Sequence, residues 1–152
     1  MVQSFCSGDF LTAEVFGKET KLQVFSIGEN CFDENGDYKE DGFAFTQEEV
    51  DCLNWLLENV RVEDYREEIT VYCNERYENI GGERITAEEL EKEVEITTII
   101  VKIGGITQSG DGSCIYPEIS FLGECGCDPE HGICIGFRDK KFLGIDVQGW
   151  TL

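Results

Sequence analysis

Residues that could perform chemistry gather in one short stretch of the chain, around a polar turn at residues 128–132. The stretch 118–137 reads EISFLGECGCDPEHGICIGF and contains His131, the only histidine, together with three of the eight cysteines. Asp128, Glu130 and His131 could act as an acid–base cluster, because imidazole titrates near neutral pH and a neighbouring carboxylate can orient it. A small hydrolase-like enzyme centred on these residues is therefore one hypothesis for the function.

The sequence lacks the groups that usually accompany such chemistry. It contains no nucleophilic serine or cysteine in a recognisable elbow, no phosphate-binding glycine loop and no two-histidine metal motif. A structural turn explains the same residues, with Asp128 capping backbone N–H groups, His131 bonding a neighbouring loop and Gly132 taking a positive φ. We therefore predict a structural turn built from Asp128, Glu130, His131 and Gly132, and no catalytic residue.

The cysteines of this stretch raise a second hypothesis, a small zinc protein. The pattern C-x-C-x3-H-x2-C supplies four candidate ligands, Cys125, Cys127, His131 and Cys134. Strand geometry argues against this site, because successive side chains point to opposite faces of a sheet. Cys125 and Cys127 share parity with the buried residues of their strand, whereas Cys134 points to the opposite side of the next strand. We expect ordinary buried thiols, and neither a metal nor another cofactor.

Strands are the elements that must position the turn. Apolar and polar residues alternate over residues 118–125 and again over 133–138, which predicts a hairpin whose apolar side faces one core. Residues 94–103 read VEITTIIVKI and are apolar on both faces in the middle, which is typical of a central strand. Further strands are predicted at residues 10–16, 21–27, 43–45 and 142–147, with a turn at 17–20.

Residues between the N-terminal and the C-terminal strands follow a helical period. A capping box opens at Thr46 before an apolar stripe, which predicts a first helix. A second helix is predicted over residues 62–79, where Tyr72 and Arg76 belong to one face, and a short third helix follows a second capping box at Thr86.

This order of elements predicts a single α+β domain over residues 1–152. The expected sheet is mainly antiparallel and built from N-terminal and C-terminal strands, with two to three helices inserted between them. A chain of 152 residues can bury an adequate core without a disulfide or metal.

Charge restricts the class of partner. The chain carries 32 acidic and 12 basic residues, a formal net charge of −20. Such a charge argues against nucleic acid and anionic membranes, and it attracts basic proteins. Residues 28–95 contain 22 acidic and 6 basic residues, so this part holds −16 of the −20. The excess predicts either a solvated face of two helices or a docking surface for a basic protein.

The N-terminal sequence and the apolar runs predict the compartment. MVQSFCSGDFL has no basic start, uninterrupted apolar core or small-residue cleavage site. The longest apolar candidate, residues 96–106, is about half of the ~20 residues that span a bilayer, and it includes Lys102. We therefore expect a cytoplasmic protein with reduced thiols and no membrane span.

The turn resembles the C-terminal hallmark of a bacterial family of unknown function. In that family a strand ends in Cys-x-Trp-Asp-x-Glu-His-Gly-x-Gly, and residues 125–134 read CGCDPEHGIC. Cys127 stands where tryptophan is usual, and Cys134 stands where the second glycine is usual. The resemblance extends to Asp128, Glu130, His131 and Gly132 and implies no established activity. Small acidic bacterial domains of this kind resemble immunity proteins, which bind and neutralise a toxin.

Together these observations favour a non-enzymatic bacterial protein that binds a basic protein, with inhibition of the immunity type as one form of that function. The alternative is a small metalloprotein or hydrolase-like enzyme centred on the turn. The sequence does not predict an oligomeric state.

Overall fold

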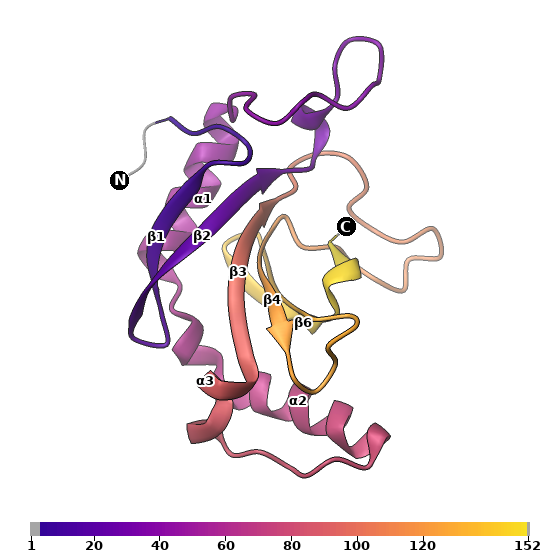
Figure 1. The fold of residues 1–152 in the computed structure, drawn as a ribbon. Helices are drawn as coiled ribbons and strands as arrows, with labels where there is room; N and C mark the ends of the chain where they lie inside the picture. The colour runs from indigo at the N-terminus through magenta and orange to yellow at the C-terminus, as the bar shows by residue number, and fades with distance from the viewer. Residues whose placement is uncertain (1–3, 152) are drawn as a thin grey trace.

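The computed structural model describes residues 4–151, which build a six-stranded sheet (Figure 1). The strands cross the sheet in chain order, from β1 to β6. β2 and β3 are parallel, and every other neighbouring pair is antiparallel. The strands are β1 (Phe10–Val15), β2 (Lys18–Ser26), β3 (Val94–Val101), β4 (Ile119–Cys125), β5 (Ile133–Arg138) and β6 (Lys141–Asp146).

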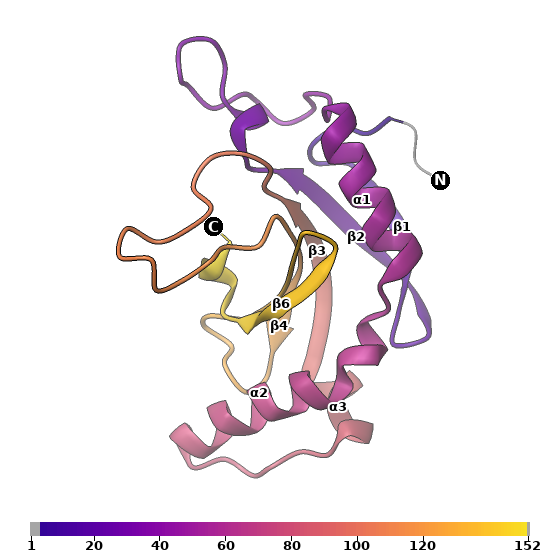
Figure 2. The same ribbon diagram turned by 180° about the vertical axis from the view of Figure 1, so that it is seen from behind.

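The connection between β2 and β3 carries all three α-helices, since parallel neighbours require a long crossover. α1 lies on one face of the sheet and contacts β3 and β4, and α2 lies near the end of the sheet where β3 begins (Figures 1 and 2). The helices are α1 (Gln47–Asn59), α2 (Arg66–Ile80) and α3 (Leu90–Glu93), and the 3₁₀ helices are η1 (Glu29–Cys31), η2 (Val62–Tyr65), η3 (Ala87–Glu89) and η4 (Gln148–Trp150). The predicted α+β class, with helices between N-terminal and C-terminal strands, is confirmed.

Both predicted capping boxes are present. Thr46 and Thr86 accept hydrogen bonds from the backbone three residues later, and the glutamate there bonds back. Glu49, the glutamate of the first box, is only 1% exposed. Its carboxylate also accepts bonds from the Ser26 hydroxyl and from Asn30 Nδ2, the latter at 2.8 Å. The start of α1 is therefore fixed to the end of β2.

Two local predictions were wrong. The N-terminal hairpin turns at Phe16 and Gly17, not over residues 17–20, because these two residues take φ of +53° and +75° and let β2 begin at Lys18. The expected strand at 43–45 is absent among the described residues, since Ala44 forms only one isolated bridge with Cys6.

The sheet is buried on both faces around β3. The larger core cluster lies under the helices and includes Leu53 of α1, Ile69 of α2 and Ile99 of β3. The smaller cluster joins Ile100, Leu122 and Cys134, and Trp150 of η4 packs against it. β3 is thus the predicted central strand. No helix within residues 4–151 is long and apolar enough to cross a membrane.

β2 and β3 pair along only part of their length. Residues 23–26 of β2 pair with residues 98–101 of β3, and the strands diverge towards the N-terminal hairpin turn (Figure 1). Residues 18–22 of β2 still pair with β1, and residues 94–98 of β3, apart from Thr97, still pair with β4. We call the gap between residues 18–22 and 94–97 the split.

Candidate functional site

The turn at residues 128–132 joins β4 to β5 and is held by its own first residue. The Asp128 carboxylate accepts a hydrogen bond from the His131 backbone N–H at 3.3 Å. The Asp128 carbonyl accepts one from the Gly132 N–H at 2.9 Å. These two bonds close the turn.

Gly132 is required by both conformation and space. Its φ is +65°, a region that L side chains rarely adopt. A Cβ at this position would lie 2.6 Å from the carbonyl oxygen of Gly123, which is backbone and cannot move aside easily. The turn is therefore packed directly against β4.

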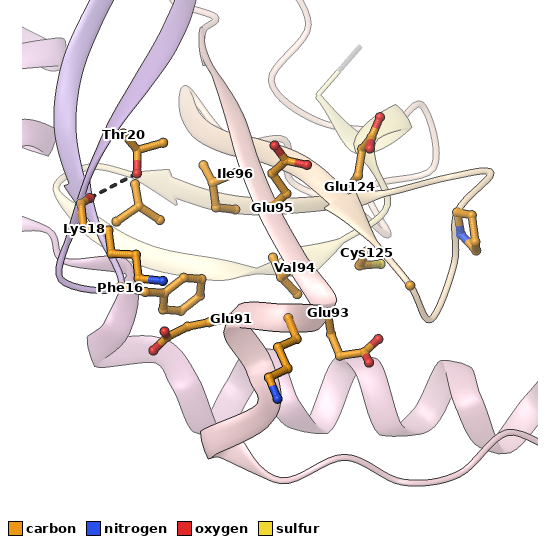
Figure 3. A pocket seen from close by; sticks show the side chains of 14 residues that line it. Phe16, Lys18, Thr20, Glu91, Glu93, Val94, Glu95, Ile96, Glu124 and Cys125 are labelled. Carbon is orange, nitrogen blue, oxygen red and sulfur yellow. Dashed lines mark hydrogen bonds between the residues drawn. The ribbon is translucent and has the colours of Figure 1, made fainter.

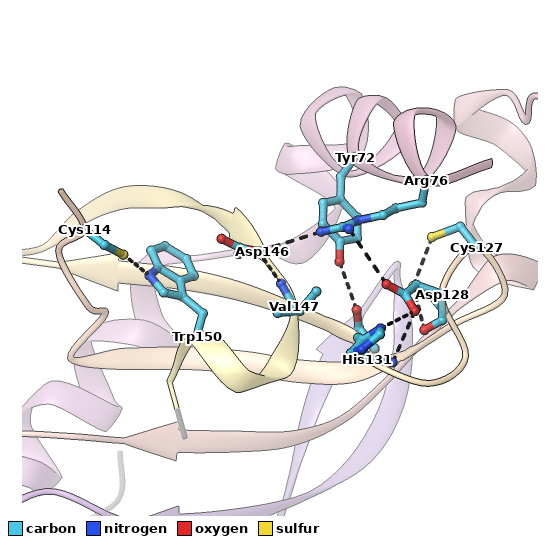
Figure 4. A network of polar contacts seen from close by, with 11 residues as sticks. Tyr72, Arg76, Cys114, Cys127, Asp128, His131, Asp146, Val147 and Trp150 are labelled. Atoms are coloured by element: carbon cyan, nitrogen blue, oxygen red, sulfur yellow. Dashed lines mark hydrogen bonds and ion pairs between the residues drawn. The ribbon is translucent and has the colours of Figure 1, made fainter. Parts of the chain in front are cut away.

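Two side chains of α2, Tyr72 and Arg76, point towards the turn (Figure 4). The Tyr72 hydroxyl donates a 3.0 Å hydrogen bond to the Gly132 carbonyl. Burial raises the pKa of Tyr72, so its hydroxyl stays a donor. The Arg76 guanidinium lies 4.8 Å from the centre of the Tyr72 ring and approaches Asp128 at 3.9 Å and Asp146 of β6 at 3.8 Å. α2, the turn and β6 are thereby linked.

The C-terminal segment supports the turn from a third side. The backbone N–H of Gln148, at the start of η4, donates to the His131 carbonyl at 3.0 Å. The side-chain amide of Gln148 donates to the Gly123 carbonyl at 2.6 Å. α2, which precedes the turn in the chain, and η4, which follows it, therefore both bond this short loop.

The His131 side chain is more exposed than expected for a structural residue. Its Nδ1 lies 2.9 Å from Asp128 Oδ1, so the imidazole pairs within the turn instead of bonding a neighbouring loop as predicted. The side chain is 59% exposed, against 15% for Asp128. Glu130 is exposed, and within the part of the chain that the structure describes it joins no hydrogen bond or ion pair.

The turn holds the His131 imidazole against the Asp128 carboxylate, and such a pair is one part of an acid–base catalytic site. However, Asp128 already serves two groups of His131 with one oxygen and faces Arg76 with the other. Both oxygens of Asp128 therefore already face groups of the fold, Oδ1 within the turn and Oδ2 towards α2, which favours a structural role.

A cluster of three buried thiols lies beside the turn, between β4 and α2. The Sγ atoms of Cys125 and Cys127 are 3.0 Å apart, and Cys73 of α2 completes the cluster. Hydrogen bonds from Cys127 and Cys73 lower the pKa of Cys125, and the bond to Cys125 raises the pKa of Cys73. All three side chains are buried, and all eight cysteines are free thiols. Reading the strands alone missed Cys73, because nothing in a helix pattern indicates which strand it will face.

The four candidate zinc ligands do not converge. Cys134 lies in the smaller core cluster, on the opposite face of the sheet from Cys125. Burial there raises the pKa of Cys134 to about 12. Cys125 and Cys127 are also closer than the ~3.8 Å that two thiolates at Zn–S distances of about 2.3 Å would keep in a tetrahedral site. Within residues 4–151, no group of three or more His, Cys, Asp or Glu side chains is placed to hold a metal ion.

The acidic segment forms an exposed and largely unneutralised surface. Of its 22 acidic side chains, only Glu49 is buried. Glu91, which meets Arg66, is the only one in an ion pair among the described residues. The acidic residues that point outward from α1 and α2 are Glu48, Asp51, Glu58, Glu67, Glu68, Glu75 and Glu78.

The fold is an α+β domain with a split sheet, an internally satisfied turn and an acidic helical surface. The chain belongs to the family described as Domain of unknown function (DUF6985), whose model matches residues 4–150. The sequence predicts membership of a family of unknown function, and the match agrees with that prediction. No curated protein and no solved structure matches the chain.

Proposed function

We propose that this protein is a non-enzymatic module that binds a basic protein through its acidic helical surface. Inhibition of a toxin, as immunity proteins do, is the form of this function that the resemblance suggests. The observation that carries the proposal is the net charge of −16 in residues 28–95, where Glu91 is the only acidic residue in an ion pair among residues 4–151.

Electrostatics gives the physical reason. Carboxylates on neighbouring turns of a helix repel one another at i,i+3 and i,i+4 spacing, which costs a few tenths of a kcal/mol per pair. Glu75 and Glu78 of α2 have this spacing and are both exposed. A surface that retains such repulsion gains affinity when a complementary positive surface approaches, and the long-range field also accelerates encounter.

Capture of a partner from a lysate of the source cells tests the proposal. The immobilised protein should retain a basic protein at about 0.05 M salt and release most of it at about 0.5 M, because the Debye length falls from ~14 Å to ~4 Å. Capture of no protein, or only of proteins whose retention is indifferent to salt, would contradict the proposal.

A matched pair of variants separates this surface from net charge. Glu58→Lys with Glu78→Lys reverses two exposed charges on α1 and α2, and Glu130→Lys with Asp139→Lys reverses two exposed charges outside the segment. Both change the net charge equally. We expect the first pair to weaken binding of the captured partner at least about tenfold, or 1.4 kcal/mol, and the second pair to change it by less than about threefold. Equal effects would mean that the helical surface has no special role.

A further inference from the structure

We infer that the split between β2 and β3 receives an extended, basic segment of the partner, which adds a strand to the sheet. This inference rests on the proposed function and adds a second contact to it. One segment of the partner binds the split in an extended conformation, in addition to the contact with the acidic helical surface.

The backbone edges on both sides of the split are unpaired. β2 and β3 share a ladder only over residues 23–26 and 98–101. Residues 18–22 therefore use one edge for β1, and residues 94–97 use one edge for β4. Among residues 4–151, no strand lies between the two facing edges. Free edges of this kind are the template for β-strand addition, in which main-chain hydrogen bonds supply affinity.

The split is a groove of suitable size and polarity. It encloses about 620 Å³. Phe16, Lys18 and Thr20 line one side, and β3 with Val94 and Ile96 lines the other (Figure 3). The buried side chains at its floor are Val15, Val94, Ile96 and Cys125. An apolar floor under a polar rim is the usual composition of a ligand-binding groove.

The outer side of the split carries unbalanced negative charge. Glu95 of β3 and Glu124 of β4 are exposed and lie directly opposite each other in the antiparallel ladder. Glu14 and Glu19 form a second such pair between β1 and β2. Like charges at directly opposite positions destabilise a sheet. A cation placed beside either pair would convert this repulsion into attraction.

The alternation of the strands predicts the pattern of the bound segment. Paired residues on neighbouring strands share a face, so a residue beside Val94 or Ile96 would point to the apolar floor. A residue beside Glu95 would point to the outer side, where the carboxylates lie. The occupant is therefore an extended segment in which small apolar residues alternate with lysine or arginine.

The open end of the split is held in place by Arg66. Its guanidinium lies 4.9 Å from the centre of the Phe16 ring at the hairpin turn, donates a 3.1 Å bond to the Ala87 carbonyl and pairs with Glu91 of α3. The hairpin is thus fixed to the crossover on one side, which keeps the two edges apart and accessible.

Titration of the ¹⁵N-labelled protein with synthetic peptides tests the inference by NMR. The probe is a short capped peptide that alternates valine and lysine; the matched peptide has the same composition with valines and lysines in separate blocks. We expect the alternating peptide to shift the backbone amides of residues 18–22 and 94–97 and to bind at least about tenfold more tightly than the block peptide. Equal affinity of the two peptides, or shifts confined to the outer faces of α1 and α2, would overturn the inference. Shifts at the split that depend on protein concentration without peptide would also overturn it, since the occupant would then be a second copy.

A steric block separates failure of this inference from failure of the proposed function. Thr20→Trp places a large side chain in the split, and Thr12→Trp places one on an exposed position of β1 outside it. Binding of the lysate partner should fall at least about tenfold in Thr20→Trp and stay within about threefold in Thr12→Trp. If Thr20→Trp binds the partner like the parent protein while Glu58→Lys with Glu78→Lys does not, the split is not the site and the acidic surface still is.

Discussion

The turn at residues 128–132 and the split between β2 and β3 differ in how far their polar groups are satisfied. The turn holds the residue types that chemistry needs, yet Asp128, His131 and Gly132 are bonded to one another, to α2 and to η4. The split is lined by four glutamates, two lysines and a cysteine, but among residues 4–151 it leaves two strand edges without a paired strand and the exposed Glu95 and Glu124 without an ion pair. Available bonding capacity, more than residue type, indicates where a second molecule can bind.

The comparison predicts that small changes in the turn affect stability strongly. Gly132→Ala should lower the free energy of unfolding by about 3 kcal/mol or more, because it adds the strain of a positive φ to a clash with the Gly123 carbonyl. Gly36→Ala is the control, since Gly36 also has a positive φ but no atom within 4 Å of a Cβ. It should cost only about 1 kcal/mol. Equal losses in urea unfolding would mean that close packing of the turn is unimportant.

The link between α2 and the turn should have a smaller effect. Tyr72→Phe removes the hydroxyl that bonds the Gly132 carbonyl and leaves that buried oxygen short of a donor. We expect a loss of about 1 to 2 kcal/mol in thermal or urea unfolding. Tyr38→Phe should stay within about 0.5 kcal/mol, because Tyr38 is 78% exposed. A Tyr72→Phe protein as stable as the parent would show that α2 does not support the turn.

The sequence predicts much of the fold because its local signals agree. The capping boxes at Thr46 and Thr86, the alternating hairpin around the turn and the doubly buried β3 all depend on residues close in the chain. The opposite placement of Cys125 and Cys134 also follows from strand alternation alone.

Contacts across long sequence separations could not be predicted in the same way. Periodicity shows which face of a helix is buried but not which loop that face meets, so the bond from Tyr72 to Gly132, 60 residues away, was not foreseen. The one sequence feature related to this bond is the helical spacing that places Tyr72 and Arg76 on the same face of α2. The split was missed for a related reason, because a strand pattern does not reveal where two parallel neighbours stop pairing.

The smallest expected change in stability belongs to Glu130 and His131, the outermost residues of the turn. The same two substitutions also test whether the turn or the split binds the partner. Glu130→Ala with His131→Ala removes two exposed side chains. Within the described part of the chain, the imidazole forms a polar contact with Asp128 alone. We expect the free energy of unfolding to change by less than about 1 kcal/mol, as for an exposed ion pair. This loss of stability is smaller than the loss expected if the imidazole formed a hydrogen bond with a buried group.

The decisive measurement is the dissociation constant of the captured partner for this double variant and for Thr20→Trp, determined side by side at low salt. The double variant should bind within about threefold of the parent protein, and Thr20→Trp should bind at least about tenfold more weakly. The opposite result, with binding lost in the double variant and kept in Thr20→Trp, would contradict the account and place the function at the exposed turn.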